Sequence, residues 1–317
     1  MDIEKKIPLI VWIILDTFLI LLAIVLGVFF YRHPAKGPDN LEVAEENPKL
    51  EIPIEEKYQS YSRLVRNQYW IKDGILYGSG ENREGQLGTG KLDASEEGTR
   101  EMVQIAENVV HVDSFQSTVV YLTEDNELWG MGDNFSGQLG VPIAKDDRTG
   151  KERYVTSPVL IAEGVKYATV GMNTVLMLME DGKVYILGDN KNGQLGPTLD
   201  EREYLKDESS MIVTYSYEPI LIMENAVYVA SGLYTLAAIN EKGELYMWGD
   251  NSFGEIGNGN RGEGLPTISI YYVSEPYLVK KNIKDVAFDE FTVYATNYWE
   301  EVYAWGNSYG TKPKKIK

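Results

Sequence analysis

The chain has 317 residues and a formal net charge of −18, with 48 acidic side chains against 30 basic ones. It has no cysteine and two histidines, which excludes disulfide bonds, thiolate nucleophiles and zinc sites built from cysteine. Binding the phosphate backbone of a nucleic acid requires a basic face, which this composition disfavours. We therefore expect no cofactor, no nucleic-acid partner and no enzymatic activity. A hydrolase that uses a pair of carboxylates stays open as an alternative.

The chain begins with a short tail, residues 1–7, followed by 23 nearly all apolar residues at 8–30, where Asp16 is the only charge. That length spans the hydrocarbon core of a bilayer with some tilt. We predict a retained single-pass transmembrane anchor. A cleaved signal peptide is the alternative, but no convincing cleavage site precedes residue 31. Asp16 would either pair with a membrane partner or lie protonated at a contact of no special meaning.

Residues 31–58 are predicted to form an acidic tether. Between residues 41 and 57 there are six acidic and two basic side chains, together with Pro48 and Pro53. This composition is typical of a solvated, extended linker. Basic residues flank the anchor almost equally, so the positive-inside rule gives little orientation. A tethered domain beyond a short tail favours a cell-membrane protein with residues 59–317 outside the cytoplasm. The absence of cysteine fits a bacterial surface protein.

One motif recurs along residues 59–317. Its turn glycines lie 52 to 61 residues apart and are Gly80, Gly132, Gly188, Gly249 and Gly306. Asparagine follows two positions later in four copies, as Asn82, Asn134, Asn190 and Asn251. Gly-Gln-Leu-Gly then occurs at 85–88, 137–140 and 193–196, Gly-Glu-Ile-Gly at 254–257, and the last copy keeps Gly310 alone. We interpret these glycines and asparagines as structural, because glycine allows sharp turns and asparagine tolerates left-handed geometry.

Strands are predicted around each motif. A hairpin pair such as Asp73-Gly74 or Asp181-Gly182 lies seven residues before the turn glycine, and an apolar run precedes most pairs. Further upstream of three pairs lies a short apolar segment led by proline, at Pro158, Pro219 and Pro276. Several short strands joined by tight turns at a period near fifty are typical of β-propeller blades.

The Trp-Gly-Asp-Asn and Gly-Gln-Leu-Gly elements resemble the repeats of the regulator of chromosome condensation family, over about residues 60–317. The resemblance implies a propeller, and family members typically resemble seven-bladed rings. It also implies two functions: a guanine-nucleotide exchange factor for a small GTPase, and an inhibitor of a cell-wall enzyme. For this chain we predict an all-β propeller of about five blades. We expect the proline-led C-terminal segment, residues 312–317, to complete the first blade and close the ring.

Insertions fall at the same point of each repeat, after the Gly-Gln-Leu-Gly element, and should emerge on one rim. They cover residues 89–100, 141–157, 197–218 and 258–275. The candidate ligand-binding residues in or near them are Asp146, Asp147, Arg148, Tyr204, Tyr215, Tyr217, Tyr271 and Tyr272. Rim tyrosines suit recognition of a protein or a sugar, although some could instead pack between blades. We therefore predict a membrane-tethered, non-enzymatic module that binds a protein or a cell-surface glycan.

Overall fold

The computed structural model describes residues 59–61, 67–93, 99–142, 153–196, 204–206, 212–261 and 272–317. The chain divides into two compact units, residues 1–49 and 50–317, and all described residues belong to the second. These residues form strands and turns, and they include no helix long and apolar enough to cross a membrane. The predicted tail, anchor and tether at 1–7, 8–30 and 31–58 lie outside the described residues.

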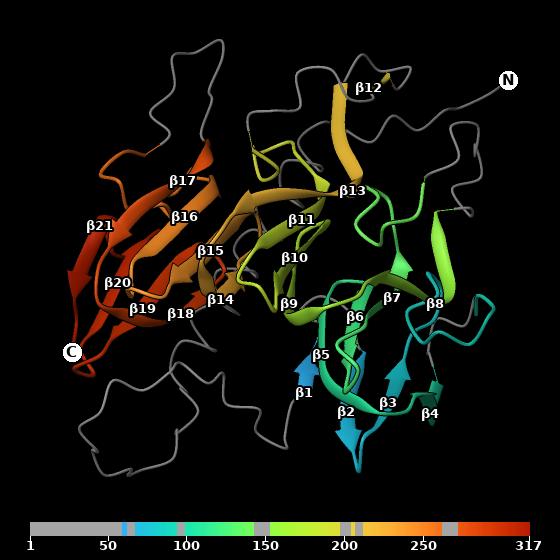
Figure 1. Ribbon diagram of the computed structural model, residues 1–317. Coiled ribbons are helices and arrows are strands. Elements are labelled where there is room, and N and C mark those ends of the chain that lie inside the picture. The colour runs from blue at the N-terminus through green and yellow to red at the C-terminus, as the bar shows by residue number, and fades with distance from the viewer. Residues whose placement is uncertain are drawn as a thin grey trace, which may run out of the picture. The chain divides into compact units, whose positions relative to one another are not determined.

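The described strands form five sheets that follow one another in chain order (Figure 1), and we call them blades 1 to 5. Blade 1 contains β1 (Gln59–Tyr61), β2 (Gln68–Lys72), β3 (Ile75–Gly80) and β4 (Thr99–Ala106). Blade 2 contains β5 (Val109–Phe115), β6 (Thr118–Thr123), β7 (Leu128–Asp133) and β8 (Tyr154–Ala162). Blade 3 contains β9 (Val165–Gly171), β10 (Thr174–Met179), β11 (Val184–Asp189), β12 (Tyr204–Lys206) and β13 (Ile212–Met223). Blade 4 contains β14 (Ala226–Ser231), β15 (Thr235–Asn240), β16 (Leu245–Asp250) and β17 (Tyr272–Lys280). Blade 5 contains β18 (Ile283–Asp289), β19 (Thr292–Asn297), β20 (Val302–Gly306) and β21 (Gly310–Lys315).

The prediction of an all-β propeller with five blades is confirmed for the described residues, but the order of strands within a blade differs from the prediction. Each proline-led strand is the last strand of its own blade, not the first of the next. For example, β8, which contains Pro158, pairs antiparallel with β7. The strand that opens each new blade lies between the proline-led strand and the next apolar run. Proline suits the outer position because an edge strand can lack one backbone donor at little cost.

The predicted closure of the first blade by the C-terminal segment was wrong. β21 pairs with β20 in blade 5, and the first blade receives its opening strand from β1, which pairs with β2. The physical reason is the short last motif. Gly306 pairs with Gly310, so a tight turn returns the chain directly alongside β20. No long insertion separates the two strands, as it does in the other blades.

The hairpin pairs adopt the left-handed geometry that their residues allow. Asp73 (φ 52°) and Gly74 (φ 73°) both have positive φ, which is the pattern of a two-residue type I′ turn. In the other four hairpins, one residue of each predicted pair is left-handed, namely Asn126, Gly182, Gly243 and Glu300. These four hairpins accordingly have longer loops, as in blade 2, where the turn joins Leu122 to its partner Leu128.

The core lies in four seams between consecutive blades. Each seam is filled by buried side chains from the facing sheets, with Met131 between blades 1 and 2 and Trp248 between blades 3 and 4 as examples. Each of the first four motifs adds one fully buried aliphatic side chain to the seam that follows it: Leu87, Leu139, Leu195 and Ile256. The motif is therefore part of the packing between blades as well as a turn.

The outward faces of the two terminal blades are more polar than the seams. At the residue before the turn glycine, blades 2 to 5 have Met131, Leu187, Trp248 and Trp305, all fully buried, whereas blade 1 has the half-buried Ser79. At the far end, blade 5 has no aliphatic motif residue, because its motif is shortened. Repeat arrays commonly carry a polar outer face on their end units. Among the described strands, blade 5 does not pack on blade 1 as closely as neighbouring blades pack on each other.

The motif rim as candidate functional site

The four complete motif turns lie at the same end of their blades and define one edge of the molecule, which we call the motif rim. It consists of residues 81–88, 133–140, 189–196 and 250–257. The turn glycines are required because the loop that joins the first two strands of the blade lies directly against them. A Cβ atom on Gly249 would lie 2.2 Å from the carbonyl oxygen of Tyr234. The same close approach occurs at Gly132, Gly188 and Gly306, all of which have positive φ, as has Gly80.

The motif asparagines stabilise the turns by hydrogen bonds, and none of them has positive φ. The expectation that they supply left-handed geometry was therefore wrong. In each complete motif the Asn Oδ1 accepts a hydrogen bond from the backbone N–H five residues later, as from Leu139 to Asn134 at 2.9 Å. An amide is suited to this position because its Nδ2 can also donate. Asn134 Nδ2, for example, donates to the carbonyl of Val141 at 2.8 Å.

Two residues separate the asparagine from the next glycine, and they form the tips of the motif rim. One residue of each pair is exposed, namely Arg83, Phe135, Lys191 and Phe253, whereas Ser136 in blade 2 is buried. Phe135 is 48% exposed and Phe253 is 36% exposed. Basic side chains take a tip position in blades 1 and 3, as Arg83 and Lys191. The rim therefore presents both aromatic and basic side chains at positions that the repeat leaves free to vary.

Arg153 is the centre of a cluster of side chains on the rim of blade 2. The Arg153 guanidinium lies 5.0 Å from the ring centroid of Phe135 and 4.8 Å from that of Tyr154. Its Nε lies 3.4 Å from Asp133 Oδ1, and its Nη2 donates to the Tyr154 hydroxyl at 3.0 Å. Cation–π contacts and a partly buried carboxylate together hold this arginine in place. Arg153 thereby fixes the position of the exposed Phe135 ring.

Aromatic side chains also join the rims of blades 3, 4 and 5. The rings of Phe253 and Phe291 lie 4.4 Å apart and come from blades 4 and 5. Burial raises the pKa of Tyr234, on the loop of blade 4, and the nearby carboxylates of Asp189 and Asp250 add to the rise. This part of the rim combines aromatic faces with carboxylates from two blades.

Several carboxylates of the rim have shifted pKa values. Burial raises the pKa of Asp133 to about 6; the Arg153 guanidinium opposes this rise, and Glu84 adds to it. Burial likewise raises the pKa of Asp189. Burial raises the pKa of Glu255 to about 7, against two backbone N–H groups and with Asp250 adding to the rise. Perturbed groups of this kind often mark functional sites, although structural packing produces them too.

The predicted site residues do not form one cluster. Asp146, Asp147, Arg148 and Tyr271 lie outside the described residues. Tyr204 lies on β12, while Tyr215 is buried at 4% exposure on β13. Tyr217 and Tyr272 each pack on the first glycine of the Gly-Gln-Leu-Gly element of the preceding blade, since a Cβ on Gly137 would lie 2.9 Å from Tyr217 and one on Gly193 would lie 2.5 Å from Tyr272. Tyr272 nevertheless keeps 41% exposure, at the edge of the motif rim.

The described ends of the insertions lie at this rim. Gly90, in the insertion of blade 1, donates its N–H to the Thr156 carbonyl of blade 2 at 2.7 Å, and Gly259 donates to the Thr311 carbonyl of blade 5 at 2.8 Å. Phe135, Phe253, Phe291, Tyr234 and Arg153 were not among the residues predicted from the sequence. A signal for the first two was present, because each fixed turn motif contains two variable positions, and an aromatic residue at one of them is unusual for a turn.

Comparisons with known proteins add a repeat family and a fold. Residues 226–255 match the regulator of chromosome condensation (RCC1) repeat. The X-linked retinitis pigmentosa GTPase regulator of Canis lupus familiaris is 35% identical over 140 residues, which is 43% of this chain and 12% of that protein. The serine/threonine-protein kinase Nek9 of Mus musculus is 28% identical over 243 residues, which is 74% of this chain and 24% of that protein. The chain spans 12% to 39% of the length of the curated relatives it matches. The relatives named here are eukaryotic, and a bacterial origin stays a prediction.

Solved structures agree on the fold. Prp20p of Saccharomyces cerevisiae superposes with a TM-score of 0.61 at 20% identity, covering 79% of this chain and 61% of that one. Human WBSCR16 superposes with a TM-score of 0.62 at 15% identity, covering 79% of this chain and 65% of that one. Identities this low show a shared fold and not a shared function. The chain therefore carries the regulator of chromosome condensation repeat within an RCC1-like β-propeller fold.

Proposed function

We propose that this propeller is a protein-binding module and that it recognises its partner with the motif rim. The observation that carries the proposal is the pair of exposed phenylalanines at the motif tips, Phe135 and Phe253. Aromatic residues and arginine are enriched in the energetic centres of protein interfaces. The Arg153 guanidinium lies over the ring of Phe135, and Phe253 packs on Phe291 in a tilted arrangement, so each anchor ring has a neighbour that holds it before binding. A pre-ordered anchor loses little side-chain entropy on binding.

The net charge of the chain, −18, indicates the chemistry of the partner. The rim itself is mixed, because its aspartates Asp189 and Asp250 are buried while Arg83 and Lys191 are exposed. Complementary charge increases the association rate and discriminates against wrong partners. The proposed partner is therefore a basic protein whose contact surface has apolar pockets for the two phenylalanine rings and acidic groups opposite Arg83 and Lys191.

The proposal is tested by co-purification of tagged full-length protein and its Phe135→Ala/Phe253→Ala variant from the native host. Loss of two anchor rings should weaken partner binding at least tenfold. Trp299→Ala is the matched control, because Trp299 is 67% exposed but lies on a hairpin turn at the opposite end of blade 5. Equal partner recovery by the wild-type protein and the double variant would contradict the proposal.

A second candidate function is guanine-nucleotide exchange on a small GTPase. It is favoured by the names of the relatives: a GTPase regulator matches by sequence, and the structure of Prp20p is described with its binding to Gsp1p and histones. Activities of those longer proteins do not transfer by partial coverage alone. Accelerated release of labelled GDP from a candidate GTPase would support exchange activity, whereas release at the intrinsic rate across a panel of GTPases would remove it.

Membrane tethering through residues 8–30, with the propeller outside the cytoplasm, is part of the same proposal and rests on the apolar length of that segment. On this basis a cell-surface glycan or a cell-wall enzyme competes with a protein receptor as the partner. Protease treatment of intact cells that express a C-terminally tagged chain tests the orientation. Removal of the tag without lysis is expected, and protection until lysis would place the propeller in the cytoplasm.

A further inference from the structure

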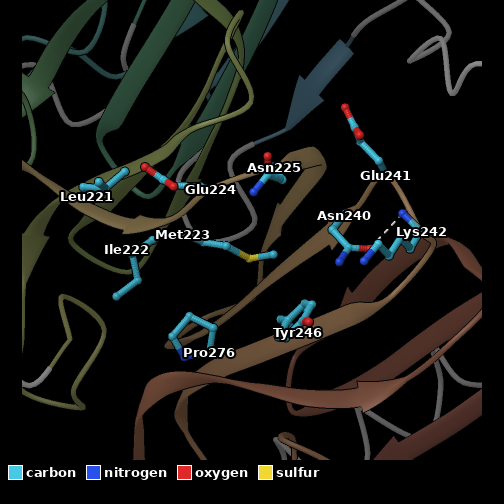
Figure 2. A pocket seen from close by; sticks show the side chains of 10 residues that line it. All are labelled: Leu221, Ile222, Met223, Glu224, Asn225, Asn240, Glu241, Lys242, Tyr246 and Pro276. Carbon is cyan, nitrogen blue, oxygen red and sulfur yellow. Dashed lines mark hydrogen bonds between the residues drawn. The ribbon is translucent and has the colours of Figure 1, made fainter.

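A cleft of about 780 Å³ lies between blades 3 and 4, at the end of the blades opposite the motif rim (Figure 2). Blade 3 contributes Ile222, Met223 and Glu224, and blade 4 contributes Glu241, Tyr246 and Pro276. Figure 2 shows the Met223 side chain pointing into the cleft from the blade 3 side, with Tyr246 and Pro276 on the blade 4 side. This cleft is separate from the surface proposed above for protein binding.

The equivalent position between blades 4 and 5 is occupied by a lysine of the chain itself. The Lys280 ammonium lies 3.9 Å from the ring centroid of Tyr303. The Tyr303 hydroxyl donates to Glu301 Oε2 at 2.9 Å, and Asn297 Nδ2 donates to the same oxygen at 2.7 Å. The tyrosine ring is thus fixed by two polar neighbours and presents its face to a cation, which is a favourable arrangement when the cation is partly desolvated.

The same framework recurs between blades 3 and 4. The Tyr246 hydroxyl donates to Glu244 Oε2 at 3.3 Å, and Asn240 Nδ2 donates to that oxygen at 2.9 Å. A lysine also neutralises the carboxylate in both places, Lys281 at Glu244 and Lys315 at Glu301. The two tyrosines therefore have the same support.

The residue that faces the tyrosine ring differs between the two sites. Lys280 is the strand partner of Leu245 in blade 4, and at the corresponding position of blade 3 Met223 is the strand partner of Val184. The cleft between blades 3 and 4 therefore has a thioether where the site between blades 4 and 5 has an ammonium group. Among the described residues, no cation lies over the ring of Tyr246 as Lys280 lies over Tyr303.

The side chains at the mouth of the cleft also differ in charge from those of the equivalent site between blades 4 and 5. That site has Lys281 and Tyr298 on its two turns, whereas the cleft has Glu224 and Glu241 at the same turn positions. Both glutamates are exposed, and Lys242 is the one cation among the residues that line the cleft. An apolar floor with an open tyrosine face and two carboxylates at the mouth complements a cation on an aliphatic stem.

We propose that this cleft binds a lysine side chain of a partner protein. Its methylene stem lies along Met223, Ile222 and Pro276, and its ammonium group lies over the ring of Tyr246, near Glu224 and Glu241. Lys280 over Tyr303 shows within the same chain how such a side chain is held.

The test uses the full-length protein labelled with ¹³C at the methionine methyl groups, so that Met223 reports binding by NMR. The probe is acetyl-Ala-Lys-Ala amide, and the matched control probe contains norleucine in place of lysine, which keeps the stem and removes the charge. We expect the lysine peptide to shift the Met223 signal saturably and the norleucine peptide to bind at least tenfold more weakly. Equal affinity for the two peptides, or no shift with either, would overturn the proposal.

Variants separate this site from general charge effects. Glu224→Gln with Glu241→Gln should weaken the lysine peptide about tenfold, as expected for loss of charge pairing beside a cation–π contact. Glu163→Gln with Glu180→Gln removes the same charge at the equivalent turns between blades 2 and 3 and should leave the affinity unchanged. Met223→Lys should abolish binding, because the chain would then supply its own cation as it does at Tyr303. Unchanged binding by the Met223→Lys variant would show that the peptide binds elsewhere.

Discussion

Glu255 has a carboxyl group at the motif position where Gln86, Gln138 and Gln194 have an amide, and this difference changes the chemistry of its turn. The other complete motifs have a buried glutamine, and Gln138 Nε2 donates to Thr118 Oγ1 at 3.1 Å and to the Asp133 carbonyl at 3.0 Å. Glu255 keeps one of the glutamine contacts, because its Oε2 accepts from the Phe253 N–H at 2.8 Å. Its Oε1 is buried without a hydrogen-bond partner among the described residues. An ionised carboxylate cannot donate there, but a protonated one can.

Glu255→Gln is therefore expected to stabilise the protein, and more so at high pH. Burial raises the pKa of Glu255 from 4.5 to about 7, so the folded state holds its proton more tightly than the unfolded state does. Ionisation of Glu255 therefore destabilises the folded wild-type protein. This destabilisation is absent below about pH 4.5, grows as the pH rises and is complete above about pH 7. The variant should gain about 1–3 kcal/mol at pH 8 and much less at pH 5, measured by urea unfolding.

The reverse substitution supplies the control for this prediction. Gln138→Glu places a carboxylate at the same turn position of blade 2 and should destabilise the protein more at pH 8 than at pH 5. If both variants change the free energy of unfolding equally at the two pH values, titration of the buried carboxyl group is not the cause.

The turn glycines predict a second effect at the residue scale. Gly249 has φ +96°, and an added Cβ would lie 2.2 Å from a backbone oxygen that the turn cannot move. Gly249→Ala should lower the free energy of unfolding by about 3 kcal/mol or more. Gly164 also has positive φ, +70°, but has open space around it, so Gly164→Ala should cost about 1–2 kcal/mol. Similar losses in the two variants would show that the close backbone approach is unimportant.

At the scale of the element, the sequence contained enough to identify strands and turns but not their grouping into blades. Hairpin pairs, apolar runs and proline-led segments all correspond to strands or turns of the structure. The strand that opens each blade, such as β9 (Val165–Gly171), was not assigned to a blade, although a turn residue of positive φ, such as Gly164, directly precedes it in blades 2 to 5. Without it the proline-led strand was assigned to the wrong neighbour. Pairing between strands depends on tertiary packing, which local pattern does not encode.

The aliphatic residue of the motif links the turn to the blade that follows. Leu139 is fully buried among residues of blades 2 and 3. Leu139→Ala should lower the free energy of unfolding by about 2–5 kcal/mol, because it opens a cavity in the seam. Leu160 lies on the outer strand of the same blade at 43% exposure, and Leu160→Ala should change stability by less than about 0.5 kcal/mol. Denaturant unfolding of both variants tests the comparison, and a Leu139→Ala loss as small as that of Leu160→Ala would contradict it.

At the scale of the whole molecule, the number of blades was predictable and their closure was not. Five motif copies predict five blades, since each copy belongs to one sheet. Closure depends on which strand pairs with β20, and the short turn between Gly306 and Gly310 decides this locally. The polar Ser79 on the outer face of blade 1 is a signal that the sequence contained, because the other blades have large apolar residues there.

The insertions and the motif turns were expected on one rim, and the described ends of the insertions lie beside the motif turns, while the binding role of this rim stays a prediction. The aromatic groups found there belong to the motif turns, as Phe253 does, or to loops between the first two strands of a blade, as Phe291 does. Tyr217 and Tyr272 pack on neighbouring glycines, which a sequence pattern cannot reveal. Contacts between side chains of different blades, such as Phe253 with Phe291, depend on the arrangement of the sheets.

The most direct test of the central claim is photocrosslinking from the motif rim in living cells. A photoreactive phenylalanine analogue replaces Phe253 in one full-length variant and Trp299, on the opposite end of blade 5, in another. Binding through the motif rim predicts a discrete protein adduct from position 253 and none at the same mass from position 299. The same adduct from position 299, or none from position 253 when a partner co-purifies, would contradict recognition through this rim.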